Sequence, residues 1–407
     1  MLRDKARKRI IFLIGCLSQI PVDIVGRMYA AELIIFIMYF LYPETRPTLP
    51  PCIKKLRGFM YLWLASQLVT DIYRSTPLVD TAKGAISIIF LILLLPFMTW
   101  MLSSNIKNWI YYYFGGIVSS QLNFYLFFSQ TEFGAADIWQ AYAYAPLFSG
   151  FAVYLYSKGK YYHNIAYIVY LLFGVWILFQ GSRNVFLTSA LTTLLLYLID
   201  KYNSSNINSM RFQYQKKIWG VMFALTVGLF AVSHAYEFFA SHGYLGDKAY
   251  EKYWAQKNND LGLVSGRIET IMDIDLISKS PIIGYGSYAK DTWGYKASFM
   301  REHGLRVIET DKDEINMLPR HSAMFGTTMW HGLGCGVFWI FILLTFYRSF
   351  RSGYFITDPA VLMICVSAMF SSLWNTFFSP FAGRLGYIII WVYLLLSYNH
   401  YIKVRNE

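Results

Sequence analysis

The sequence predicts an all-α polytopic membrane protein with about twelve transmembrane helices and one large polar loop. Hydrophobic residues make up 56% of the chain and charged residues only 15%, whereas soluble domains carry about 25% charged residues. Aromatic residues reach 19%, and Trp and Tyr favour bilayer interfaces. Residues 85–102 and 163–180 are almost unbroken apolar runs. Runs of about 18 residues are long enough to cross the hydrocarbon core of a bilayer.

These patterns divide the chain into three parts. Residues 1–236 hold nine predicted spans, residues 237–320 form the polar loop, and residues 321–407 hold three more spans and a tail. The predicted spans are 10–23, 26–42, 58–75, 84–102, 109–129, 138–157, 163–180, 182–199, 218–236, 321–346, 359–377 and 384–402. The first two are short, and the first is expected to remain because no small-residue cleavage site follows it. The prolines of 43–51 end the second span, since proline cannot continue a helix.

The distribution of charge sets the expected orientation. The net charge is +12, but the basic residues gather at the start of the chain and in the connections expected on one side. The polar loop carries nearly balanced charge. This is the positive-inside pattern, which places both termini in the cytoplasm and the loop outside. It argues against a nucleic-acid partner and for the lipid bilayer as the surroundings of the chain.

The cysteines and the acidic residues do not suggest a metal site. Cys16, Cys52, Cys335 and Cys365 are scattered without a CxxC pair, so we expect no disulfide, metal or cofactor. In the loop, the spacing of the apolar positions predicts a short amphipathic helix on the membrane surface, which ends before Pro281. Its Asp273-x-Asp275 resembles a metal-binding DxD motif, but we expect both acids on a solvated face.

Four arginines are expected at the outer face. Arg183 follows a short turn between two spans, Arg267 precedes the loop helix, Arg320 ends the loop, and Arg384 begins the last span. Each could simply extend to the lipid headgroups or, for Arg267, pair with Glu269 or Asp273. An arginine kept against the positive-inside bias instead suggests phosphate binding, because guanidinium bonds phosphate bidentately.

The predicted base is His321, at the start of the tenth span. A helix N-terminus disfavours imidazolium, so a neutral His321 could accept a proton from a sugar hydroxyl. Asp23 and Asp80, in the first two outer turns, are alternative bases. His331 is expected to pack within the bundle.

Four stretches, taken in order, resemble the bacterial O-antigen polymerase and O-antigen ligase superfamily. They are Gln180-Gly-Ser-Arg-Asn184; Gly266-Arg-Ile-Glu269 with Ser280-Pro-Ile-Ile-Gly-Tyr-Gly286; His321-Ser-Ala-Met-Phe-Gly326 with Gly332-Leu-Gly-Cys-Gly-Val-Phe-Trp339; and Phe377-Phe-Ser-Pro-Phe-Ala-Gly-Arg384. The family commonly has an acidic residue before the glycine-rich run, where this chain has Trp330 and His331.

The resemblance implies a metal-independent, inverting glycosyltransferase of the GT-C type in the bacterial inner membrane, acting at the periplasmic face. Its substrate would be an oligosaccharide on undecaprenyl diphosphate, as donor and acceptor, and a chain-length regulator protein would be a further partner. His321 and Arg267 would be catalytic, and Arg183, Arg267, Arg320 and Arg384 would bind the diphosphate. Arginines aimed at the leaving group would stabilise its growing charge without a metal.

Three functions remain open at this point. A polymerase would transfer the glycan to the non-reducing-end sugar of another lipid-linked repeat unit, and the His321 stretch resembles polymerase members more. A ligase would transfer the glycan to the lipid A core. A transporter or flippase is the remote alternative, because no half-to-half repeat is visible and few acids fall within the spans.

Overall fold

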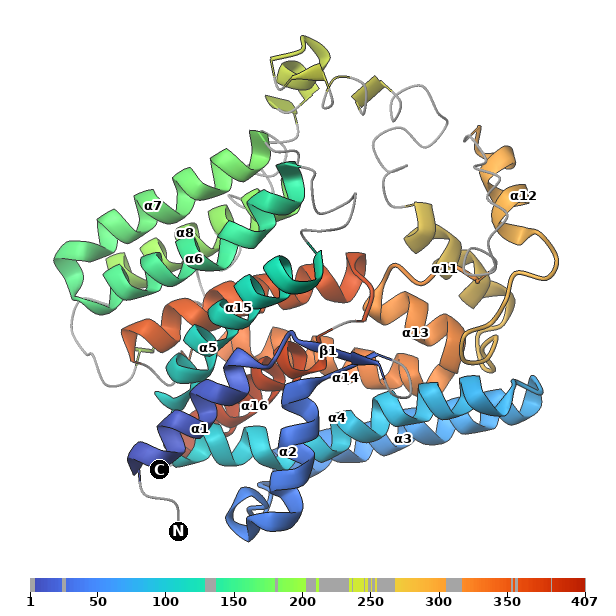
Figure 1. Cartoon of the computed structure of the whole chain (residues 1–407), viewed down its shortest axis with the longest axis horizontal. Coiled ribbons are helices and arrows are strands. Elements are labelled where there is room, and N and C mark those ends of the chain that lie inside the picture. Colours follow the sequence, from blue (N-terminus) through green and yellow to red (C-terminus); the bar gives the residue numbers. More distant parts are fainter. Residues whose placement is uncertain are drawn as a thin grey trace.

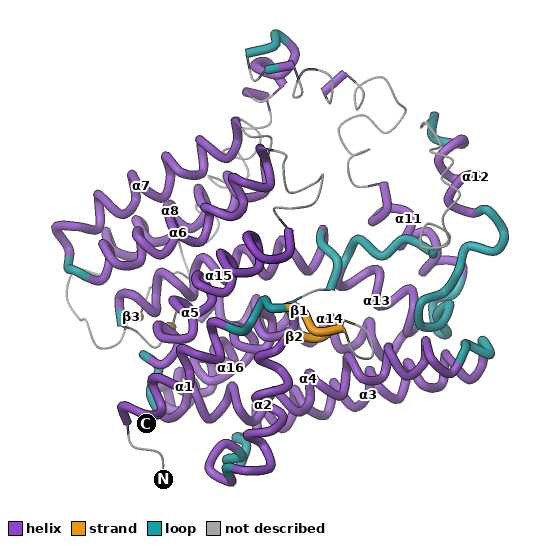
Figure 2. Tube along the Cα trace, viewed as in Figure 1, coloured by secondary structure: helices purple, strands orange, loops and turns teal. Residues whose placement is uncertain are grey.

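The computed structural model describes residues 4–23, 27–128, 137–179, 182–202, 210–211, 234–235, 237–244, 246–247, 250, 253–254, 268–304, 317–352, 354–355, 358–381 and 383–406. This part of the chain is almost entirely helical (Figure 2). The predicted span at 218–236 lies almost wholly outside it, as does much of the polar loop. The helical fold class is therefore confirmed for the described residues.

The elements follow the apolar runs of the sequence. The helices are α1 (Asp4–Cys16), α2 (Ala30–Leu41), α3 (Pro51–Tyr73), α4 (Leu78–Ser104), α5 (Asn108–Asn123), α6 (Asp137–Ser157), α7 (Lys160–Phe179), α8 (Arg183–Tyr202), α11 (Ile268–Lys279), α12 (Tyr295–Glu302), α13 (Ala323–His331), α14 (Leu333–Ser352), α15 (Pro359–Phe378) and α16 (Arg384–Asn406), with a 3-10 turn η1 (Pro43–Thr45) and a π-helical turn η2 (Phe124–Phe128). Two short antiparallel ladders pair β1 (Pro21–Asp23) with β2 (Arg27–Tyr29) and β3 (Met210–Arg211) with β4 (Tyr354–Phe355).

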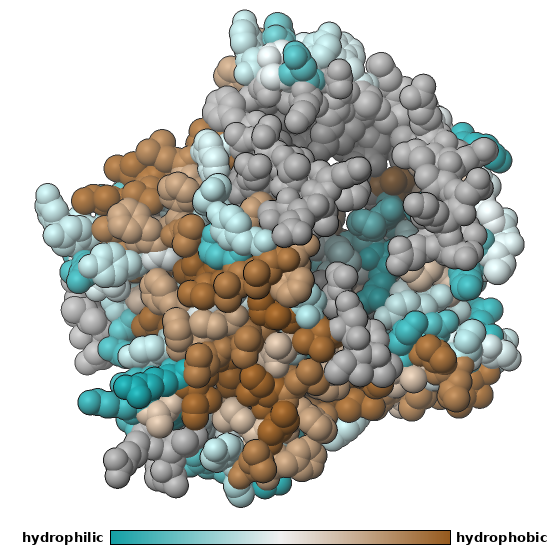
Figure 3. Space-filling model, viewed as in Figure 1, coloured by the Kyte–Doolittle hydropathy of each residue, from teal (hydrophilic) through white to brown (hydrophobic). Residues whose placement is uncertain are grey.

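Five helices of the described chain are long and apolar enough to cross a membrane: α4, α7, α14, α15 and α16. Large apolar side chains also face outward on other helices. Leu41 is 67% exposed and Ile72 is 78% exposed. Figure 3 shows a broad hydrophobic area over the middle of the molecule. Apolar surface of this extent would be costly in water, and it is suited to contact with lipid.

The helices pack around α16, whose middle is fully buried. Ile388, Trp391 and Tyr393 of this helix are each 0% exposed, and α4 and α14 pack against it. Gly15 and Gly115 let α1 and α5 approach closely. A Cβ added to Gly115 would lie 2.3 Å from the carbonyl oxygen of Phe12. Small residues at such crossings are typical of helices packed in membranes.

The two ends of the molecule differ. The start of α1 and the end of α16 lie close together at the lower left of Figure 1, and α11 and α12 lie at the right. Ser322, which precedes α13, donates a hydrogen bond from Oγ to the Thr376 carbonyl near the end of α15 at 3.1 Å. The segment that enters α13 therefore lies at the end of the bundle where α15 finishes and α16 begins.

Two predicted features need correction. The span predicted at 321–346 is two helices, α13 and α14, separated at Gly332, whose φ is +77°. The loop after α11 packs into this break: the Leu333 N–H donates to the Ile282 carbonyl at 2.9 Å, and the Tyr285 N–H donates to the Met329 carbonyl at 2.9 Å. The first two predicted spans are also shorter than expected, because the β1–β2 hairpin takes up the residues between α1 and α2.

Candidate functional site

The structure describes the side chains of two of the four predicted arginines, Arg320 and Arg384. Arg183 begins α8, but its side chain lies outside the described residues, as do Arg267 as a whole and the side chain of Asp23. Arg320 and His321 lie together ahead of α13, and Arg384 begins α16. The candidate site is therefore built from Arg320, His321, Arg384 and the side chains around them. The roles predicted for Arg183 and Arg267 stay predictions.

His321 is paired with an acid from the loop helix. Its Nδ1 contacts Glu269 Oε2, at the first turn of α11, and the His321 side chain is 62% exposed. Lys296 Nζ, on α12, lies 3.7 Å from the other Glu269 oxygen. A carboxylate that accepts from Nδ1–H fixes the ring and leaves Nε2 as the nitrogen that takes up a proton. An exposed imidazole, a carboxylate and an ammonium group thus meet at the surface of the loop region.

Glu269 and Lys296 were not predicted as site residues. We considered Glu269 only as a partner for Arg267, and Lys296 lies on a second loop helix. The one signal available in the sequence was that Glu269 begins the predicted amphipathic helix, where an acid is favoured by the helix dipole. How α11, α12 and the start of α13 meet is a tertiary feature that no local pattern specifies.

Beneath this surface cluster lies a buried acid, and here our expectation was wrong. Asp273 was predicted on a solvated face, yet it is 0% exposed. The reason is that α13 packs over this face of α11. A Cβ added to Gly326 of α13 would lie 3.2 Å from Asp273 Oδ2, so the two helices are in close contact at this glycine. Asp275 is more exposed, at 31%, and bonds Lys279 Nζ at 2.6 Å.

Burial sets the proton affinity of Asp273. Neither of its oxygens makes a hydrogen bond of normal geometry in the described part of the chain, although the Ser322 backbone N–H lies close enough to interact with the carboxyl group. Burial raises its pKa to about 8, and the backbone N–H of Ser322 and the positive charge of Arg320 oppose that rise. A carboxyl group in an apolar environment favours its neutral form for this reason. Asp273 is therefore a protonated or easily protonated acid beneath the His321–Glu269 pair.

Arg320 is also largely withdrawn from solvent. Its guanidinium carbon lies 4.5 Å from the centre of the Trp330 ring, and its Nε is buried without a hydrogen-bond partner among the described residues. Burial lowers its pKa, although an arginine keeps its charge in any protein environment. Arg320 lines a cavity of about 20 Å³ with Tyr288 and His331. A space of this size holds about one water molecule, so a diphosphate does not fit into this cavity.

Arg384 has a buried acidic partner. Its Nε donates to Glu32 Oε1 at 2.9 Å and its Nη2 donates to Glu32 Oε2 at 2.6 Å. Glu32, on α2, is 0% exposed and Arg384 is 8% exposed. The Arg384 Nη1 also donates to Ser87, which lines the cavity of Arg320, at 3.4 Å. This geometry favours a structural role for Arg384, because Glu32 already neutralises its charge.

A second buried acid holds the loop after α11 in place. Asp71, on α3, is 2% exposed. Its Oδ1 accepts from the Ser287 N–H at 2.6 Å, and its Oδ2 accepts from Ser287 Oγ at 2.8 Å. Gln67 Nε2 donates to the same Oδ2. Sequence analysis gave Asp71 no role, because a single acid within an apolar run does not reveal its partner.

His331 belongs to this buried network, in agreement with the expectation that it packs within the bundle. Trp63 Nε1 donates to His331 Nδ1 at 2.8 Å, and His331 Nε2 lies 3.4 Å from Ser287 Oγ. The tautomer that satisfies these contacts is neutral, with its proton on Nε2. The network joins α3, the loop and the end of α13. Asp80, the other base considered, lies 3.4 Å from Lys83 Nζ in the first turn of α4.

No protein-family model matches the chain, and no curated protein matches it either.

Proposed function

We propose that the chain is an inverting glycosyltransferase of the GT-C type that takes a glycan from undecaprenyl diphosphate and passes it to another lipid-linked repeat unit. The observation that carries the proposal is the exposed His321, paired with Glu269 and placed beside Lys296 at one end of a bundle of membrane-type helices. The motifs of this region supply the family resemblance. We further propose the bacterial inner membrane, about twelve spans, cytoplasmic termini and a periplasmic site.

The proposed reaction is a single displacement. The acceptor hydroxyl oxygen attacks the anomeric carbon of the donor sugar, and the bond from that carbon to the diphosphate oxygen breaks. The hydroxyl proton passes to His321 Nε2, while Glu269 accepts from Nδ1–H and stabilises the imidazolium that forms. The electron pair of the broken bond leaves with the diphosphate. Attack opposite to the leaving group inverts the anomeric carbon.

The cations have different roles in this proposal. Lys296 stands at the surface, where an ammonium group can contact a phosphate as a point charge. Arg320 is packed against Trp330, so it contributes positive potential through a low-dielectric region. Direct bidentate contact with the diphosphate is assigned to Arg183 and Arg267. Asp273 lies too deep to touch the acceptor, and it supports the α11–α13 contact.

The test uses the full-length protein in nanodiscs, with undecaprenyl-diphosphate-linked repeat units as donor and acceptor. A ladder of longer glycans on a gel is the expected product. His321→Ala should slow its formation about 100-fold or more, the usual loss for a general base. Glu269→Gln should cause a smaller loss, because it only orients the ring. Arg301→Ala, on the exposed surface of α12, serves as the matched control and should keep the ladder.

Other outcomes would redirect the proposal. Transfer that occurs only after lipid A core is added would make the chain a ligase with the same site. A ladder that persists in His321→Ala would remove His321 as the base and leave Asp80 or Asp23 to be tested. If the protein only moves the lipid-linked glycan across the bilayer of sealed vesicles, it is a transporter. The buried Glu32 and Asp71 do not favour transport, since both are held by fixed partners.

A further inference from the structure

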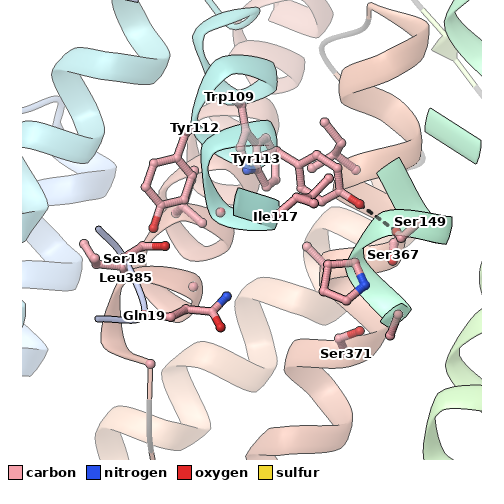
Figure 4. A pocket seen from close by; sticks show the side chains of 18 of the residues that line it. Ser18, Gln19, Trp109, Tyr112, Tyr113, Ile117, Ser149, Ser367, Ser371 and Leu385 are labelled. Atoms are coloured by element: carbon pink, nitrogen blue, oxygen red, sulfur yellow. Dashed lines mark hydrogen bonds between the residues drawn. The ribbon is translucent and has the colours of Figure 1, made fainter. Parts of the chain in front are cut away.

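A second, much larger cavity lies within the bundle. It measures about 640 Å³ and is bounded by the turn after α1, by the end of β2, and by α5, α6, α7, α8, α15 and α16. Figure 4 shows part of its lining. On α8 it reaches Val185 and Thr188, on α16 it reaches Leu385 and Ile389, and on α5 it reaches the last residue, Asn123. On α5 it also reaches Trp109, near the start of that helix. The cavity therefore runs along the bundle and reaches the end where α8 and α16 begin, next to Arg384.

The lining is uncharged and mainly apolar, with hydroxyl and amide groups set among the apolar side chains. Among the described residues that form it, none is Asp, Glu, Lys, Arg or His. Hydroxyl groups recur instead, and two tyrosines are paired with serines across helices. The Tyr113 hydroxyl lies 2.6 Å from Ser149 Oγ, and the Tyr170 hydroxyl lies 2.7 Å from Ser367 Oγ. The Tyr170 hydroxyl also interacts with Ser149, so the four groups form one network, and its four hydroxyl hydrogens serve three contacts and leave one to donate.

We propose that this cavity binds an uncharged sugar of a lipid-linked glycan, held by the Tyr–Ser hydroxyl pairs and packed against the aromatic rings of the lining. The proposal rests on the glycan substrate proposed above and deepens it with a site for the sugar itself. A cavity of several hundred cubic ångströms that combines aromatic surface with a few placed polar groups is typical of small-ligand sites.

The lining favours a sugar over the two other occupants. Most hydroxyl groups of the wall already form hydrogen bonds within the protein. An isoprenoid chain would, however, offer no hydrogen-bond partner to the amide side chains of Gln19 and Asn123 in the wall, and a buried polar group left unpaired costs about 1–3 kcal/mol. A diphosphate would enter a space with no cation among the described lining residues, and its charge would be uncompensated. A neutral sugar offers hydroxyl groups to the polar groups of the lining and apolar ring faces to Trp109 and Tyr112, which also line the cavity.

One wall residue allows a clean test. Gly386, on α16, lines the cavity, and a Cβ added to it would meet no atom within 4 Å. Gly386→Phe should therefore place a ring in the cavity, and narrow it, without a clash at Cβ. Gly58→Phe is the matched control, because Gly58 also has no neighbour within 4 Å and lies outside the cavity, on α3.

The experiment measures saturation transfer by NMR from the full-length protein in nanodiscs to lactose or cellobiose. Transfer is expected in the wild type and in Gly58→Phe, and it should be lost in Gly386→Phe. The double variant Tyr170→Phe, Ser367→Ala should bind about tenfold more weakly, the effect of losing one or two hydrogen bonds. Because this pair leaves the backbone and most of the volume unchanged, it keeps the test valid if Gly386→Phe fails to fold.

Two results would overturn the proposal. One is the absence of saturation transfer to any neutral sugar in the wild type. The other is cross-linking of a benzophenone-labelled isoprenoid diphosphate to Ser149 or Ser367, abolished by Gly386→Phe, which would make the cavity a lipid site. The NMR experiment measures sugar binding directly and does not require glycosyltransferase activity. Binding without a glycan ladder would contradict the proposed function alone, and a ladder without sugar binding would contradict the cavity proposal alone.

Discussion

At the scale of single residues, the buried Asp273 couples protonation to stability. Burial raises its pKa in the folded protein to about 8, from the ordinary value of 3.8 for an aspartate. Between these values the folded state binds the proton and the unfolded state does not. The stabilisation that the neutral Asp273 carboxyl group gives to the folded protein is therefore fully present below about pH 4. It is lost as the pH rises toward 8. The slope is at most about 1.4 kcal/mol per pH unit.

The variant Asp273→Asn should flatten this part of the pH dependence. We expect the Tm of Asp273→Asn to rise relative to the Tm of the wild type as the pH is raised from 5 to 8. Asp275→Asn is the control. The pKa of Asp275 is lowered, with the hydrogen bonds from Lys279 and Tyr295 outweighing burial, so it stays ionised across this range. Parallel Tm profiles for the wild type and Asp273→Asn would show that Asp273 is already solvated.

The buried Glu32–Arg384 pair makes a second prediction at this scale. Arg384→Met alone should lower the free energy of unfolding by about 3–5 kcal/mol, because it leaves a buried carboxylate without its partner. The double variant Glu32→Leu, Arg384→Met should regain most of that loss. Unfolding in SDS measures both. If the double variant is as unstable as Arg384→Met alone, the unpaired charge of Glu32 is not the cause of the loss in stability.

At the scale of elements, helix crossings depend on glycines whose roles differ. Gly115→Ala would bring a methyl group to 2.3 Å from the Phe12 carbonyl oxygen, so α1 and α5 must separate. We expect a loss of about 1–3 kcal/mol, the usual cost of overpacking. Gly58→Ala is the control, since its Cβ meets no atom within 4 Å. Thermal unfolding of both variants measures the difference, and equal Tm values would contradict the close crossing.

The division of the tenth predicted span is also a property of elements. Hydropathy alone joins residues 321–346, because the apolar run continues through Gly332. In the structure the backbone turns there, and the loop segment 282–287 bonds the freed groups of Met329, Trp330 and Leu333. Buried backbone groups must find partners, so a break at this point requires the loop. The sequence contains the glycine but not the evidence that another segment would fill the break.

At the scale of the whole molecule, the charge distribution predicts orientation. We expect cysteine introduced at Arg301, on exposed loop helix α12, to react with a membrane-impermeant maleimide in intact cells. Cysteine at Lys403, exposed near the end of α16, should react only after the inner membrane is opened. The four native cysteines, all free thiols, would first be replaced by alanine. Reaction at both positions in intact cells would contradict the positive-inside assignment.

The sequence by itself determined the helical class and the position of most membrane-type helices. The reason is that about 18 consecutive apolar residues must form a helix to satisfy the backbone in a bilayer, and this requirement is local. It also placed His321 close to the start of a helix. Tertiary structure alone decided which charges meet: Glu269 with His321, Glu32 with Arg384, and Asp71 with Ser287. These partners are far apart in sequence, and only the packing of α11 on α13 buries Asp273.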